Sequence, residues 1–71
     1  MSMNDYAMDM AEDIISNTYK KVSEGEIDFD GAQRIYVDDL TSNERTALDF
    51  LGIHDEIDFR EAIEITGDIN E

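Results

Sequence analysis

The sequence predicts an all-α protein: a small bundle of three to four helices with a long N-terminal helix, in a single acidic helical domain of residues 1–71. Apolar residues recur at intervals of three and four, which is the spacing of one helix face. Proline is absent, so no segment is interrupted, and capping residues and glycines divide the chain into separate helices. A chain of 71 residues buries only about 60% of its unfolded surface, so we expect a thin core.

The clearest predicted element is the first helix, of about five turns. Its apolar stripe consists of Met8, Ala11, Ile15, Tyr19 and Val22, with Thr18 beside them. Ser2 or Asn4 is expected to cap its start. Lys20 and Lys21 lie near its end, where the helix dipole favours cations. Gly25 then supplies the expected stop.

The letters EIDF occur twice, at residues 26–29 and 56–59. Each copy follows a helix and a short turn, and each is expected to open another helix. Asp28 and Asp58 are the predicted N-caps, and Glu61 completes a capping box in the second copy. The repeat records either an old duplication of a helix pair or the reuse of a good helix start, and two copies do not decide between these origins.

The remaining helices follow from these starts. Their apolar faces are Phe29, Ala32, Tyr36 and Leu40 in the second; Ala47, Leu48 and Leu51 in a third, with Thr41, Ser42 and Asn43 as capping residues; and Phe59, Ala62, Ile63 and Thr66 in a fourth. The letters RIYV at residues 34–37 are rich in β-formers, which leaves a short strand as the alternative there. Gly52 and Gly67 are the expected ends of the third and fourth helices, with residues 53–56 as a linker and 68–71 as a frayed tail.

The first EIDF copy also resembles half of a calcium-binding loop. Such a loop needs alternating oxygen ligands, a glycine and a closing bidentate glutamate. Aligned on the glycine, the ligand positions hold Glu26, Asp28 and Asp30, but Val37 stands where the closing carboxylate belongs. The second copy has Glu61 in place of the glycine. The sequence therefore predicts a structural joint here, with no metal and no cofactor.

Catalytic motifs are missing from the sequence. The histidine, His54, is followed by Asp55 in a polar linker, with no cysteine in the chain and no clear nucleophile nearby. A pair of this kind is typical of solvated neighbours more than of a general base. The chain also lacks a glycine-rich phosphate loop. We expect a protein that is not an enzyme.

Charge is the dominant feature of the composition. Nineteen acids face five bases, which gives a formal net charge of −14. A surplus of this size repels nucleic acid and anionic membranes and attracts basic surfaces. The chain shows neither a signal peptide nor an apolar run long enough to span a bilayer, so we expect a soluble, cytoplasmic protein. Apolar residues make up 41% of the chain and recur with a period, which favours a folded domain over disorder.

Several of these acids form a row on the first helix. Asp5, Asp9 and Asp13 are spaced at i, i+4 and i+8, and with Glu12 they lie on one flank of the apolar stripe. Successive carboxylates of the row are about 6 Å apart along the axis, similar in scale to a row of backbone phosphates. Further candidate binding residues are Asp38, Asp39, Asp55 and Glu56. One hypothesis is a solvated face that keeps the protein soluble. The other is a carboxylate array that imitates DNA or RNA.

A tiny chain without cysteine, with rows of Asp and Glu, resembles the small acidic nucleic-acid mimics encoded by phages. These include antirestriction proteins, certain anti-CRISPR proteins and inhibitors of uracil-DNA glycosylase. The resemblance covers the composition of the whole chain and includes no shared motif, so it assigns no role to any residue. It implies an inhibitor that binds a basic nucleic-acid-binding protein of a host defence system.

The alternative hypothesis is a small helical adaptor or structural module. Such a protein binds a partner, or a second copy of itself, through apolar helix faces. Met1, Met3 and Met10 are candidates for this contact, because methionine adapts to many surfaces and Met10 is expected to lie off the core stripe. Homo-oligomers are therefore left open by the sequence.

Overall fold

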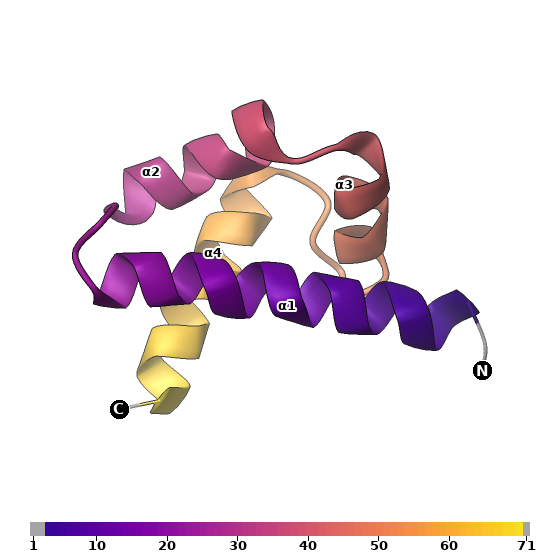
Figure 1. Ribbon diagram of the computed structural model, residues 1–71, viewed down its shortest axis with the longest axis horizontal. Helices are drawn as coiled ribbons and strands as arrows, with labels where there is room; N and C mark the ends of the chain where they lie inside the picture. Colours follow the sequence, from indigo (N-terminus) through magenta and orange to yellow (C-terminus); the bar gives the residue numbers. More distant parts are fainter. Residues whose placement is uncertain (1–2, 71) are drawn as a thin grey trace.

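The computed structural model describes the backbone of residues 3–70 and the side chains of residues 6–69. Within that range the chain forms helices and no strand (Figure 1). The elements are α1 (Met3–Ser23), α2 (Phe29–Arg34), the π-helix η1 (Ile35–Asp39), α3 (Ser42–Asp49) and α4 (Glu56–Asn70). The predicted all-α class, with a long N-terminal helix, is confirmed.

Helix α1 organises the packing. It runs across the front of the view in Figure 1, with α3 beside its N-terminal half, α2 beside its C-terminal half and α4 crossing behind it. Helix α2 packs mainly on α4. The shortest dimension of the molecule is 16 Å, against 35 Å for the longest. Since a helix with its side chains is about 10–12 Å wide, few residues are shielded on all sides.

The core gathers where these helices meet. Its buried apolar residues are Ala11, Ile14, Ala32, Tyr36, Ala47, Leu48, Ile53, Phe59 and Ile63. Phe59, Leu48 and Ile63 are the largest fully buried side chains. The rings of Tyr36 and Phe59 lie 5.7 Å apart in a tilted contact, which joins η1 to α4. Aromatic pairs at this separation contribute beyond the area they bury.

The core face of α1 agrees with the predicted stripe except at its two methionines. Ala11, Ile14 and Thr18 are buried, at the i, i+3, i+7 spacing of one face. Met8, predicted to begin the stripe, is 40% exposed, whereas Met10 packs against the core. The prediction that Met10 lies off the core is therefore wrong. Ile15, Tyr19 and Val22 of the predicted stripe pack against the core as partly buried residues, and Ile14 is buried beside them.

Two helices end as predicted at glycines. Gly25, with φ 81°, donates its N–H to the Val22 carbonyl at 3.1 Å. The N–H of Glu26 reaches back to the Lys21 carbonyl at 2.9 Å. This pair of bonds is a Schellman motif, and Gly52, with φ 83°, closes the same pattern after α3. Both positions require a left-handed backbone that glycine adopts without strain.

The start of α2 follows the prediction and the start of α3 adds a capping box. The Asp28 carboxylate accepts the N–H of Gly31 at 2.7 Å, as an N-cap does. The Thr41 hydroxyl accepts the N–H of Glu44, and the Glu44 carboxylate accepts the N–H of Thr41. Between them, the RIYV segment is helical, and the Leu40 N–H closes a π-turn onto the Ile35 carbonyl at 3.0 Å. The alternative of a strand there is wrong.

The prediction for the start of α4 is wrong by three residues. Asp58 is not the N-cap, because α4 begins at Glu56 and Asp55 caps it. The Asp55 carboxylate accepts the Asp58 N–H at 2.8 Å, and its carbonyl accepts the Phe59 N–H at 3.1 Å. The Asp58 carboxylate instead accepts the backbone N–H of His54 at 3.1 Å. Residue 56 therefore belongs to the helix and not to the linker.

The end of α4 also differs from the prediction. Gly67 does not stop the helix, which continues to Asn70, and residues 68–70 are therefore helical and not a frayed tail. The reason for glycine lies in packing: a Cβ at this position would stand 3.2 Å from the Tyr19 ring. Gly67 thus lets α4 approach α1 closely.

The predicted cap of α1 at Ser2 lies outside the described residues, as does the side chain of Asn4.

Candidate functional site

The acidic row of α1 is exposed to solvent. Asp9, Glu12 and Asp13 are all exposed. Because each residue turns the helix by about 100°, Asp9 lies opposite the buried Ala11 and Ile14, whereas Glu12 and Asp13 are each about 100° from one of them and flank the core face on its two sides. The predicted row thus spans the exposed side of α1. Asp5 lies on the same helix, but its side chain is outside the described range.

No base among residues 6–69 neutralises this row. The ion pairs found there join His54 to Asp49 and Arg60 to Asp30 and Glu64. Asp9 and Asp13 instead line a shallow hollow of about 390 Å³, together with Glu44 of α3. We call Asp9, Glu12, Asp13 and Glu44 the acidic face. The sequence does not indicate Glu44, because its place beside α1 depends on how α3 packs.

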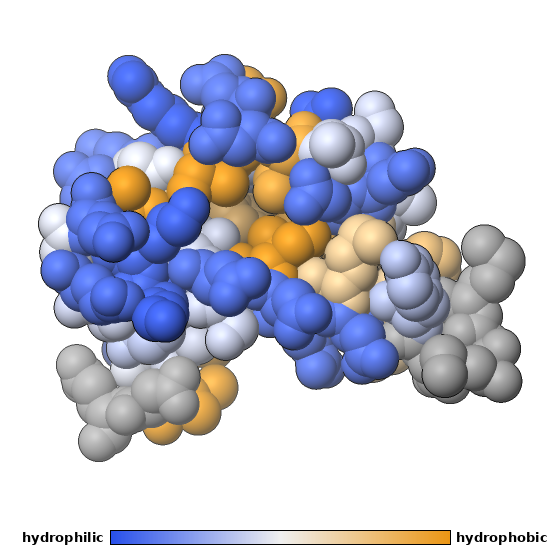
Figure 2. Space-filling model, viewed as in Figure 1, coloured by the Kyte–Doolittle hydropathy of each residue, from blue (hydrophilic) through white to orange (hydrophobic). Residues whose placement is uncertain are grey.

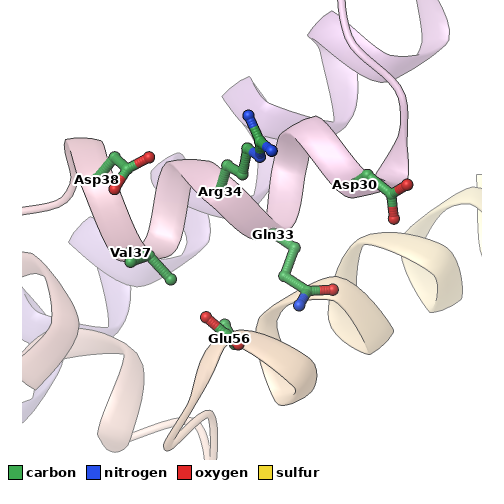
Figure 3. Close-up of a pocket in the computed structure, with 6 residues that line it drawn as sticks. All are labelled: Asp30, Gln33, Arg34, Val37, Asp38 and Glu56. Carbon is green, nitrogen blue, oxygen red and sulfur yellow. The ribbon is translucent and has the colours of Figure 1, made fainter.

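The other predicted acids gather at the start of α4. Asp38 of η1 and Glu56 of α4 line one hollow of about 440 Å³, shown in Figure 3 with Asp30 and Arg34. Asp55 and Glu56 line a neighbouring hollow of about 320 Å³ beside Arg45 and His54. The structure therefore brings Asp38, Asp55 and Glu56 together. Asp39 is exposed and lines neither of these hollows.

Charge is mixed on this second surface. Arg34 and Arg45 line its hollows, and the Arg60 guanidinium donates to Asp30 at 2.6 Å and to Glu64 at 3.2 Å. The hydrogen bond to Glu64, followed by the bond to Asp30, raises the pKa of Arg60. A partner that carries Lys and Arg would meet positive as well as negative groups here. The acidic face on α1 is therefore the stronger candidate for binding a basic surface.

His54 pairs with a residue that the sequence did not indicate. Its Nδ1 lies 2.8 Å from the Asp49 carboxylate, whereas the expected neighbour was Asp55. This hydrogen bond raises the pKa of His54 above its ordinary value. Both side chains are exposed. The pair therefore ties the end of α3 to the residues just before α4.

Two acids at the calcium-like ligand positions, Asp28 and Asp30, have partners elsewhere in the protein. Asp28 accepts the Gly31 N–H as an N-cap, and Asp30 is bonded to Arg60. In the part of the chain that the structure describes, no three histidine or acidic side chains are grouped in a way that could hold a metal ion. The two acids in question thus have structural partners already.

Hydrophilic side chains dominate the face of the molecule shown in Figure 2, with apolar side chains visible in the hollow above α1. Among the helices described, none combines the length and the apolar character needed to cross a membrane. Comparison with known proteins finds no match: no family model, no curated protein and no solved structure is similar to this chain.

Proposed function

We propose that this protein is a cytoplasmic inhibitor that binds another protein by mimicking DNA or RNA. Its acidic face would occupy the basic nucleic-acid-binding surface of a host defence enzyme, such as a CRISPR–Cas or restriction enzyme. The observation that carries the proposal is the row of Asp9, Glu12 and Asp13, exposed on α1 and paired with no base in the described residues.

The energetics of the row support this function. Carboxylates at i, i+4 on a helix repel one another by a few tenths of a kcal/mol per pair. Lysine at the neighbouring turns would relieve that repulsion, but Lys20 and Lys21 stand at the far end of α1. A partner's Lys and Arg side chains would supply the missing cations. The helix also fixes the backbone that carries the carboxylates before binding, so less entropy is lost on association than for a disordered segment.

The net charge extends the reach of this surface. A charge of −14 attracts a basic cleft from a distance and speeds the encounter, most strongly at low salt. The same field repels nucleic acid itself, which fits a protein that competes with nucleic acid for a shared partner. The mixed charge around Asp38, Asp55 and Glu56 makes that surface a secondary contact at most.

The test compares two variants that each remove three negative charges. One changes the acidic face, with Asp9→Asn, Glu12→Gln and Asp13→Asn; the control changes exposed acids elsewhere, with Glu24→Gln, Glu26→Gln and Asp68→Asn. Partners captured from a host lysate and eluted with a salt gradient supply the binding assay. We expect the first variant to lose affinity by about tenfold or more and the control by about twofold or less.

Two further results bear on the proposal. DNA or RNA should displace the protein from the captured partner, and the acidic-face variant should show a smaller salt dependence, since fewer charges then face the cleft. Equal affinities of the two triple variants at physiological salt would contradict the mimicry and would mean that the row is only a solvated face.

A further inference from the structure

Helix α4 carries a row of isoleucines that the fold does not bury. Ile57 and Ile65 are each 56% exposed and Ile69 is 77% exposed, at positions separated by multiples of four. At about 100° per residue, Ile65 and Ile69 lie about 40° apart on one side of the helix, and Ile57 lies about 80° from Ile65. Buried residues of α4, such as Phe59 and Ile63, occupy a different side. Exposed apolar side chains grouped on one helix side commonly mark an interaction surface.

One of these isoleucines borders a groove. The groove has a volume of about 440 Å³ and lies between α1, the segment after α3 and α4. Ile15, Leu51 and Ala62 contribute apolar walls, and Ile65 forms an exposed edge. Asp58 and Glu61 also line it, and no Lys or Arg among residues 6–69 does. We call this the α1–α4 groove. It is separate from the acidic face, which shares no residue with it.

We propose that the α1–α4 groove binds an amphipathic helix of a partner protein, with Lys or Arg beside the apolar side of that helix. Helices commonly dock in apolar grooves through side chains at i, i+3, i+4 and i+7. The apolar walls would take such side chains, while the carboxylates of Asp58 and Glu61 would face the basic residues. This inference goes beyond the proposed mimicry and does not depend on it.

Charge decides between this occupant and its rivals. A second copy would bring another net charge of −14 and would place its own Asp58 and Glu61 near those of the first. Like charges brought together across an interface oppose association. An anionic membrane is repelled for the same reason. A basic amphipathic helix matches both the apolar walls of the groove and the negative charges of Asp58 and Glu61.

The experiment uses three synthetic peptides of the same length, with acetylated and amidated ends. The first places leucine at helical spacing with lysine elsewhere, the second has the same residues in scrambled order, and the third replaces each lysine of the first with glutamate. Binding to the full chain is measured by fluorescence titration at physiological salt. We expect saturable binding of the first peptide, at least about tenfold tighter than either of the others.

Two isoleucines of equal exposure provide matched variants. Ile65→Ser removes the edge of the groove, whereas Ile57→Ser removes an isoleucine that lines a different hollow. The Kd of the first peptide should rise at least about fivefold more for Ile65→Ser than for Ile57→Ser. Thermal melts followed by circular dichroism check that both variants fold. A second pair of variants tests the acidic residues of the groove and leaves its apolar walls in place. Glu61→Lys changes a residue that lines the groove, and Asp68→Lys is the control outside it.

Several outcomes would overturn the inference. These are no saturable binding below about 1 mM, equal binding of the ordered and scrambled peptides, or equal effects of the two isoleucine changes. A dimer in sedimentation equilibrium that Ile65→Ser dissociates would assign the groove to a second copy. The triple variant of the acidic face should keep a difference between ordered and scrambled peptides, so this test and that of the mimicry can fail separately.

Discussion

The two EIDF copies share four residues but form different structures. In the first copy, Asp28 is the N-cap and the helix begins at the phenylalanine. In the second, all four residues lie inside α4, which begins at the glutamate. Ile27 is half-buried at the entry to α2, whereas Ile57 is exposed on the helix surface. The same letters therefore place their apolar side chains in different environments.

The residue before each copy explains the difference. Gly25 precedes the first copy and, with its positive φ, ends α1 in a Schellman motif. The next residues then complete the turn, so the first available cap is Asp28. Asp55 precedes the second copy and its carboxylate accepts the Asp58 N–H, which lets the helix begin three residues earlier. A helix start therefore depends on which capping residue comes first after the preceding turn.

The two copies nevertheless pack together. Helix α2 contacts α4, and Arg60, which follows the second copy, donates to Asp30, which follows the first, at 2.6 Å. Both side chains of this pair are partly or fully exposed, so its contribution to stability is small. The contact between copies therefore depends mainly on buried apolar groups such as Phe59.

The largest expected difference between the copies is at the phenylalanines. Phe59 is fully buried, and Phe59→Ala should cost about 3–5 kcal/mol, a large part of the stability of a small domain. Phe29 is half-buried, so Phe29→Ala should cost roughly 1–2 kcal/mol, because less apolar area is lost. Urea unfolding followed by circular dichroism measures both. Equal costs would mean that the two copies are equally buried in solution.

The next largest effect concerns the caps. Asp28→Ala and Asp55→Ala should each cost about 0.5–2 kcal/mol, because each removes an N-cap carboxylate. Asp58→Ala should cost less, since its carboxylate accepts only the His54 N–H at an exposed site. The same urea series gives the three values. If Asp58→Ala costs more than Asp55→Ala, Asp58 is the N-cap of α4 in solution and the helix begins after it.

These cases show what local sequence signals can predict. Gly25, Gly52, Asp28 and Thr41 act through neighbours within a few residues, so the helix ends and starts they define were predictable. The positions of Met8 and Met10 were not predictable, because which of them contacts the core depends on the packing of the other helices. Gly67 misled for a similar reason, since its role is a contact with Tyr19 on another helix.

The candidate site also has features that the sequence predicts and features that it does not. The spacing of Asp9, Glu12 and Asp13 on one exposed side of α1 follows from helical geometry alone. Two features depend on tertiary packing and could not be predicted: Glu44 beside the row and the groove bordered by Ile65. The pairing of His54 with Asp49 across the α3–α4 connection also needed the structure.

The hydrogen bond between His54 and Asp49 should change the stability with pH, by less than the cap substitutions do. Since the hydrogen bond to Asp49 raises the pKa of His54 in the folded state, protonation favours folding. The stabilisation should be fully present below pH 6.5, the ordinary pKa, and should be lost as pH rises through the higher folded pKa. NMR titration of the imidazole and melts across this range measure it. Asp49→Asn should return the pKa of His54 toward its ordinary value, and an unchanged pKa would contradict the pairing.

The smallest expected effect is that of calcium on the first copy. Asp28 already accepts the Gly31 N–H, Asp30 is bonded to Arg60, and Val37 stands where a closing carboxylate would be needed. Calorimetric titration of calcium at physiological salt should therefore give no saturable heat, and the melting temperature should not rise. Arg60→Ala sharpens the test, because it releases Asp30 from its ion pair while leaving Asp28 committed to the cap. If micromolar calcium binding appears in that variant alone, the ion pair between the copies is what blocks the site. If it appears in the unaltered chain, the loop is a metal site despite its missing ligand, and the first copy differs from the second in function as well as in structure.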